Sequence, residues 1–337
     1  MGAGIPTAIP GVIDRLCDGK PVELTLKVAE ADRDDHYSTR FEPDALTGGQ
    51  VPWLRRPKFL PIVASATLAT MLARKSSGAV DGFVVEGPTA GGHNAPPRGK
   101  MQLNDLGEPI YSERDQVDLN AMKELGLPFW LAGSYGSPEQ VVAAMDSGAA
   151  GVQVGTAFAF CEESGMREDI RREAIQLSKS GKIAVRTDPS ASPAGFPFKV
   201  LSLLGSLSDS ALYQLRKRYC DLGFLRQAFK KADGTLGWRC PAEPVAAYIH
   251  KGGDKQDTLD RKCVCNGLMA NVGLGQIRTD GEHESPLVTC GDDAKNLAQF
   301  LMNLDAMKYT AHDVVNYLLS LVATRPSVAA CECQAVK

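Results

Sequence analysis

Short apolar segments alternate with amphipathic ones between residues 57 and 160. The apolar segments are rich in β-branched and aromatic residues, which predicts buried strands. They are KFLPIVAS (58–65), VDGFVVEG (80–87), LPFWLAGS (127–134) and GVQVGTAF (151–158). The segments between them show helical spacing and helix-end signals. They are ATLATMLARK (66–75), VDLNAMKELG (117–126) and SPEQVVAAMDSG (137–148). Strands that alternate with helices form βαβ units, so we expect a parallel sheet covered by helices.

The pattern differs on either side of this region. Residues 20–56 interrupt the rhythm with a strand-like start and a polar loop, which we interpret as an insertion. After Phe160, charged and amphipathic segments predict helices at 163–180, 208–219, 292–303 and 310–323. We therefore predict an α/β domain at residues 1–198 and a mainly helical, cysteine-bearing domain at residues 199–337.

Composition and charge narrow the class of protein. The chain of 337 residues is 44% hydrophobic and 23% charged, as expected for a globular core with a solvated surface. Its net charge of -3 gives no basic footprint for nucleic acid or anionic lipid. No apolar run approaches the roughly 18 residues that a membrane helix needs. We expect a cytoplasmic protein with no nucleic-acid or membrane partner, and homo-oligomerisation stays open.

Nine cysteines are present, and several cluster in the C-terminal half. Thiols in a chain without a signal peptide are more often buried, catalytic or metal-bound than paired. Cys220, Cys240, Cys263 and Cys265 are candidate metal ligands, but a single residue between the last two is not the spacing of a zinc knuckle. Reduced structural thiols are the favoured interpretation.

Two glycine turns follow successive predicted strands. LAGSYGS (131–137) leads directly into a capped helix, and GVQVGT (151–156) follows one helix later. Backbone N–H groups at such turns bind phosphate without a basic side chain. In a (β/α)₈ barrel the loops after strands 7 and 8 make the usual phosphate site, and these two turns match it. The alternative is that the glycines only make tight turns.

His93 lies just after the predicted strand VDGFVVEG, behind two glycines. Histidine is often only a structural hydrogen-bonding residue, but barrel enzymes place their chemistry at the carboxyl ends of the strands. Gly91 and Gly92 would let the backbone approach a ligand, and an imidazole can take or give a proton near neutral pH. His93 is therefore the candidate catalytic residue.

Four motifs together resemble the nitronate monooxygenase family, flavin enzymes once called 2-nitropropane dioxygenases. They are AGGH (90–93), the turn at Gly133, GAAGVQVGTAF (148–158) and SPAGFP (192–197). The resemblance runs from the first residues to about Phe198, and the C-terminal half is similar to a longer branch of the family. It implies a (β/α)₈ barrel that holds FMN without a covalent bond.

The same resemblance implies roles for individual residues. His93 would be the active-site histidine, with Gly91 and Gly92 lining the flavin. Ser65 would stand where the family often has a lysine near the flavin. The phosphate would be held by Gly133, Ser134, Gly136, Gly155 and Thr156.

Counting strands back from GVQVGT, as strand 8, makes the residues MGAGIP the end of strand 4. We therefore expect a partial barrel, strands 4–8, in an N-terminally truncated family member. The expected activity is oxidation of alkyl nitronates or nitroalkanes with O₂ as electron acceptor. Two alternatives remain: a flavin-dependent enoyl-thioester reductase, and an inactive remnant.

Overall fold

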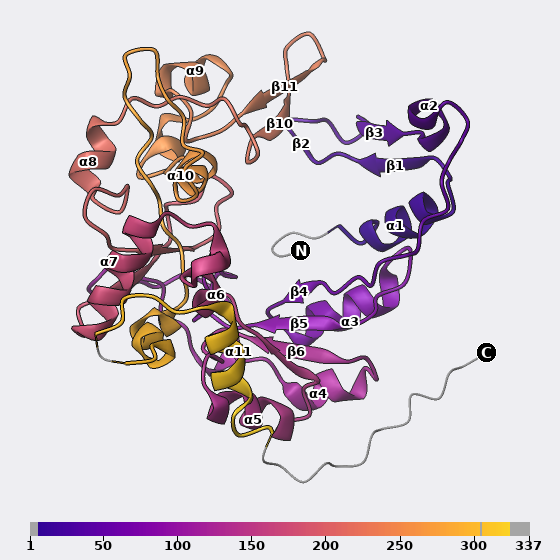
Figure 1. The fold of residues 1–337 in the computed structure, drawn as a ribbon. Coiled ribbons are helices and arrows are strands. Elements are labelled where there is room, and N and C mark those ends of the chain that lie inside the picture. Colours follow the sequence, from indigo (N-terminus) through magenta and orange to yellow (C-terminus); the bar gives the residue numbers. More distant parts are fainter. Residues whose placement is uncertain (1–5, 304, 324–337) are drawn as a thin grey trace.

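A four-stranded parallel sheet forms the centre of the α/β region in the computed structural model, which describes residues 6–303 and 305–323 (Figure 1). Its strands, in sheet order, are β4 (Ile62–Val63), β5 (Phe83–Glu86), β6 (Phe129–Ala132) and β7 (Gly151–Gln153). The helices that follow them are α3 (Ala66–Lys75), α4 (Leu119–Glu124), α5 (Pro138–Asp146) and α6 (Thr156–Ala159). The predicted alternation of strands and helices and the parallel sheet are confirmed, because strands adjacent in sequence are adjacent in the sheet.

Local sequence signals explain where these helices begin. The Ser65 hydroxyl accepts a hydrogen bond from the Leu68 N–H, and the Ser137 hydroxyl accepts one from the Gln140 N–H. Apolar side chains between the helices and the sheet are fully buried; they include Leu72, Phe83 and Met122. Because all four strands run parallel, their carboxyl ends lie at one edge of the sheet.

The chain before β4 contains α1 (Ile9–Cys17) and the predicted insertion. Arg56 ties α1 to the start of β5, because its guanidinium contacts Asp14 at 2.5 Å and Asp81 at 2.6 Å. The strand end predicted at residues 1–6 lies almost wholly outside the described residues. The sheet therefore contains the strands predicted as 5 to 8.

The segment 20–56 reaches from α1 to the C-terminal half (Figure 1). It contains an antiparallel pair, β1 (Val22–Thr25) and β3 (Ser38–Phe41), and the short helix α2 (Pro43–Thr47). Between the paired strands, β2 (Val28–Ala29) joins a separate sheet by pairing in parallel with β10 (Gln227–Lys230). We call residues 20–56 the strap. Lys230 strengthens this junction, since its ammonium lies 2.7 Å from the Asp35 carboxylate.

After α6 the chain contains strands as well as helices, and the prediction of a mainly helical domain at residues 199–337 did not include these strands. After α7 (Glu168–Lys179), β8 (Val185–Asp188) pairs with β9 (Phe198–Leu201), and β10 pairs with β11 (Leu236–Arg239). The second hairpin turns at Asp233–Gly234, where Gly234 has a φ of 80°. An Asp-Gly pair between strand-like segments is a hairpin signal that the sequence contained.

The helices of this part are short. The α-helices are α8 (Ser210–Leu215), α9 (Val245–His250), α10 (Val264–Ala270) and α11 (Ala311–Leu319), and the 3₁₀ helices are η3 (Lys255–Thr258) and η4 (Asp292–Phe300). Two further 3₁₀ turns, η1 (Glu113–Asp115) and η2 (Glu162–Ser164), belong to the α/β region. A capping box begins α11, with the Asp313 carboxylate accepting a hydrogen bond from the Thr310 N–H.

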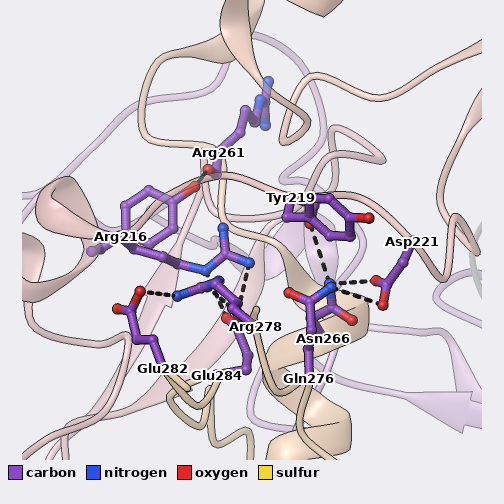
Figure 2. Close-up of polar contacts among 10 residues, drawn as sticks. Arg216, Tyr219, Asp221, Arg261, Asn266, Gln276, Arg278, Glu282 and Glu284 are labelled. Atoms are coloured by element: carbon purple, nitrogen blue, oxygen red, sulfur yellow. Dashed lines mark hydrogen bonds and ion pairs between the residues drawn. The ribbon is translucent and has the colours of Figure 1, made fainter. Parts of the chain in front are cut away.

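A buried ionic cluster fastens the segment before η4 to α8 (Figure 2). The Glu284 carboxylate is fully buried and accepts from Arg216 Nε at 2.6 Å and Nη2 at 2.9 Å. Arg278 donates to the same carboxylate at 2.7 Å, and Glu282 contacts the other side of Arg278. Glu284 and the two arginines are thus buried together, away from water.

The α/β region and the C-terminal half share a hydrophobic core. Val141 and Phe160 from the first part pack in one cluster with Val288, Leu297 and Leu318 from the second. The proposed boundary at residue 198 falls inside β9, and it stays a prediction. Within the described ranges, none of the helices combines the length and apolar character required to cross a bilayer.

Candidate active site

Two adjacent cavities lie at the carboxyl ends of the sheet strands. The first has a volume of about 350 Å³, and we call it the histidine cavity; it is lined in part by Ser65, Glu86, His93, Arg98, Tyr111 and Phe196. The second has a volume of about 320 Å³, and we call it the glycine cavity; it is lined in part by Gly92, Gly133, Ser134, Gly155, Thr156 and Asp293. Glu86, the last residue of β5, lines both.

The loop that carries His93 is pinned against β9. The Asn94 N–H donates to the Pro197 carbonyl at 2.9 Å, and the Lys199 N–H donates to the Gly92 carbonyl at 2.8 Å. His93 and Phe198 form an isolated antiparallel bridge between these two bonds. The motif SPAGFP and the AGGH turn, far apart in sequence, are therefore brought together at one site.

The imidazole of His93 is oriented by two neighbours. Its Nε2 lies 2.6 Å from the Ser192 hydroxyl, and which atom donates depends on the tautomer. The Phe198 ring meets the imidazole edge-on, with 4.8 Å between the centroids. Burial lowers the pKa of His93, which favours the neutral ring at neutral pH. A neutral, fixed imidazole can both accept a proton and donate a hydrogen bond.

Glu86 is a candidate functional residue that the sequence reasoning missed. Burial raises the pKa of its carboxyl to about 7. A buried acid with a pKa near neutrality at a cavity wall is a feature of functional sites. The available signal was its position as the polar end of the apolar run FVVE, directly before the glycine loop.

The pKa of Glu86 predicts a pH-dependent stability. The folded carboxyl keeps its proton up to about pH 7, whereas in the unfolded chain it loses it near the ordinary value of 4.5. The free energy of unfolding should therefore fall as pH rises from 4.5 to about 7, by at most about 3 kcal/mol. Urea unfolding at pH 5 and pH 8 measures this. Glu86→Gln should lose that part of the pH dependence, and an unchanged difference would refute the assignment.

The glycine turns predicted to bind phosphate surround the second cavity. Gly133 has a φ of 93°, and a Cβ there would lie 2.8 Å from Thr89 Oγ1, so only glycine fits. Ser134 follows with a φ of 59°, a strained conformation for a residue with a side chain. Gly155 and Thr156 begin α6 at the opposite wall. The structure thus brings Gly133, Ser134, Gly155 and Thr156 together at this cavity, whereas the predicted Gly136 is not one of its lining residues.

The two glycines before His93 differ in what they approach. A Cβ on Gly91 would lie 2.7 Å from the Cys290 carbonyl carbon, so this glycine makes room for the protein's own backbone. A Cβ on Gly92 would meet no atom within 4 Å, and the same holds for Gly155. Gly92 and Gly155 therefore leave open space beside the glycine cavity.

The difference between Gly91 and Gly155 predicts unequal effects of adding a methyl group. Gly91→Ala should lower the free energy of unfolding by about 1–3 kcal/mol, because rigid backbone blocks the new atom. Gly155→Ala should change it by no more than about 0.5 kcal/mol, since its φ of -109° suits alanine and the space is open. Chemical denaturation of both variants tests this. Equal losses would contradict the packing described for Gly91.

Ser65 and the clustered cysteines make contacts that stabilise the fold. Ser65 lines the histidine cavity, but its hydroxyl caps α3. Arg98, which the sequence analysis did not single out, lines the same cavity. Cys240 and Cys263 pack together in a small buried cluster. Among the described residues no three His, Cys, Asp or Glu side chains are grouped as metal ligands, so the four candidate cysteines do not form a ligand set.

The sequence model of the nitronate monooxygenase family matches residues 54–235, more than half of the chain. A curated relative from Mycobacterium tuberculosis, (3aS,4S,5R,7aS)-5-hydroxy-7a-methyl-1-oxo-octahydro-1H-indene-4-carboxyl-CoA dehydrogenase, is 26% identical over 190 residues. The match covers 54% of this chain and 48% of the relative, so the chain spans about half the length of that protein.

Three solved structures show a weak likeness. FabK from Thermotoga maritima is 17% identical, with a TM-score of 0.43 over 80% of this chain and 65% of that one. Nitroalkane oxidase from Streptomyces ansochromogenes is 18% identical, with a TM-score of 0.42 over 79% and 58%. The enoyl reductase domain of MlnA from Bacillus amyloliquefaciens is 12% identical, with a TM-score of 0.46 over 95% and 75%. On the extent of the family match, the chain belongs to the nitronate monooxygenase family of flavin-dependent oxidoreductases.

Proposed function

We propose that this chain binds FMN across the two cavities and oxidises small alkyl nitronates or nitroalkanes, with O₂ as electron acceptor. The observation that carries the proposal is the junction at Glu86. It places a cavity containing an oriented histidine next to a cavity surrounded by glycine turns. The ring and the phosphate of a flavin nucleotide would need a cavity of each kind, one beside the other.

The residues present fit such a group. Ile62, Val63, Leu68 and Phe196 give the histidine cavity apolar walls suited to a planar ring. In the glycine cavity, Gly92 and Gly155 leave open space, and Thr156 adds a hydroxyl. Gly155 precedes the first turn of α6, whose N–H groups have no partner within the helix. Backbone donors of this kind would hold a phosphate.

A bound flavin would supply the capacity to accept electrons from the substrate. The protein's own contribution begins with His93, whose imidazole would hold the negatively charged oxygens of a nitronate or remove the acidic α-proton of a nitroalkane. Ser192 keeps the ring in place through its 2.6 Å contact. Arg98 at the wall of the histidine cavity favours an anionic substrate.

A second candidate function is reduction of an enoyl thioester with a nicotinamide cofactor as the electron source. The relative from Mycobacterium tuberculosis is a carboxyl-CoA dehydrogenase, which supports a thioester substrate. The histidine cavity is open to such a substrate through its exposed wall at Arg98.

Purified protein titrated with FMN, followed by two assays, tests these functions. The proposal expects a flavin spectrum in the bound fraction and O₂ consumption with propyl-2-nitronate. Oxidation of NADPH with crotonyl-CoA, without turnover of the nitronate, would instead favour the thioester function. Absence of FMN binding would overturn both and favour an inactive remnant.

A further inference from the structure

A segment from the C-terminal half forms one wall of the glycine cavity. Residues 289–293 contact three of the turns there. The Thr289 hydroxyl accepts from the Gly92 N–H at 2.8 Å, and the Gly291 N–H donates to the Thr156 hydroxyl at 2.8 Å. Asp293 Oδ2 accepts from the Gly136 N–H at 3.1 Å. Thr156 and Gly136, which were predicted to hold a phosphate, therefore already have partners from the chain itself.

The Asp293 carboxylate contacts the turn that precedes α5. A Cβ on Gly136 would lie 2.9 Å from Asp293 Oδ2, so the glycine gives the carboxylate its place. Gln299 of η4 donates to the Gly136 carbonyl at 2.7 Å and fixes the same residue from its other side. Negative charge is favoured just before the first turn of a helix, so this carboxylate stands where an anion would bind.

The charge around this position is unfavourable for a second anion. None of the described residues that line the glycine cavity carries a Lys or Arg side chain, and Glu86 is the other acid there. The neighbouring Asp292 is neutralised by Lys199 at 2.7 Å. Asp293 has instead the Gly136 N–H and the Ser134 hydroxyl as partners. Burial raises the pKa of Asp293, and its hydrogen bond from Gly136 and the positive charge of Lys295 only partly offset this effect.

We propose that Asp293 occupies the anion position of the glycine cavity and weakens binding of a doubly charged phosphate monoester there. Asp293 is thus a specificity-determining residue for the charge of the ligand's phosphate end. The inference rests on the proposed function for the identity of the ligand, a flavin nucleotide. A flavin without phosphate is not subject to this competition.

FMN and riboflavin differ only in the phosphate, so the pair isolates the effect of Asp293. Asp293→Asn keeps an oxygen that can accept from Gly136 but removes the charge. Its dissociation constant for FMN, measured by quenching of flavin fluorescence, should fall about tenfold, and that for riboflavin should stay unchanged. Glu139→Gln is the matched control, because Glu139 is an exposed acid in the first turn of the same helix. It should leave both constants within about twofold.

Each other outcome decides the proposal. Unchanged or weaker FMN binding in Asp293→Asn, or an equal gain for riboflavin, overturns it. If neither flavin binds the unmodified chain, the proposed function fails, and inorganic phosphate becomes the probe. Phosphate should then raise the thermal midpoint of Asp293→Asn more than that of the unmodified chain, and equal shifts overturn the inference. Asp293→Ala serves in the same assays if the asparagine variant does not fold.

Discussion

Replacing His93 with asparagine should lower kcat/KM for a nitroalkane by about 10²–10⁴-fold, the usual worth of a positioned general base. Asparagine keeps a polar side chain at this position, but it cannot take the α-proton. The corresponding nitronate has already lost that proton. Its kcat/KM should therefore fall less, because only the interaction of residue 93 with the nitronate oxygens changes. Flavin affinity should change much less than kcat/KM, since the Gly92 turn and the glycine cavity are untouched.

Ser192→Ala is the companion variant for this measurement. It removes the 2.6 Å contact that orients the imidazole while leaving the imidazole in place. We expect a loss of about tenfold in kcat with both substrates, because a freer ring spends less time in the productive orientation. Equal turnover of nitroalkane by His93→Asn and the unmodified chain would remove His93 from the mechanism.

Glu284→Gln should give the largest loss of stability, about 3–5 kcal/mol in the free energy of unfolding. The carboxylate lies between Arg216 and Arg278, and its side chain is 0% exposed. Neutralising it leaves the buried Arg216 guanidinium without a counter-charge, while Arg278 keeps only the half-exposed Glu282 (Figure 2). Arg216 Nη1 already has no hydrogen-bond partner, so the site has no spare acceptor to offer among the described residues. Urea unfolding monitored by circular dichroism measures the change.

The exposed pair next to this cluster supplies the control. Lys217 and Asp280 are 2.8 Å apart, but their side chains are 73% and 45% exposed. Asp280→Asn should therefore cost no more than about 1 kcal/mol. If Glu284→Gln and Asp280→Asn lose similar amounts, the buried cluster does not have the importance assigned to it.

The parallel sheet could be predicted from the sequence because its signal is local. Each strand is a short apolar run, and α3 and α5 begin at recognisable caps, Ser65 and Ser137. The same holds for α11, where Thr310 and Asp313 lie three residues apart. Turn residues at the strand ends then placed His93 and the glycines at one edge by topology alone.

The remaining wall of the site could not be predicted in this way. Asp293 meets Gly136 across 157 residues of sequence, and no local pattern in either segment records that contact. Gly91 shows the same limit, because a glycine required for close approach has the same sequence signature whether it meets a ligand or backbone. The mixed character of the C-terminal half was, by contrast, within reach through the Asp233–Gly234 turn.

The strap has a consequence for synthesis of the chain. Its strand β2, at Val28–Ala29, pairs with Ala228–Phe229 of β10. At ribosomal rates of about 5–20 residues per second, β2 waits roughly 10–40 s for its partner. During that time its unpaired backbone edge is open to other strands, including those of neighbouring nascent chains. The strap's charged residues, among them Asp32 and Asp35, are suited to discourage such pairing until Lys230 emerges to neutralise them.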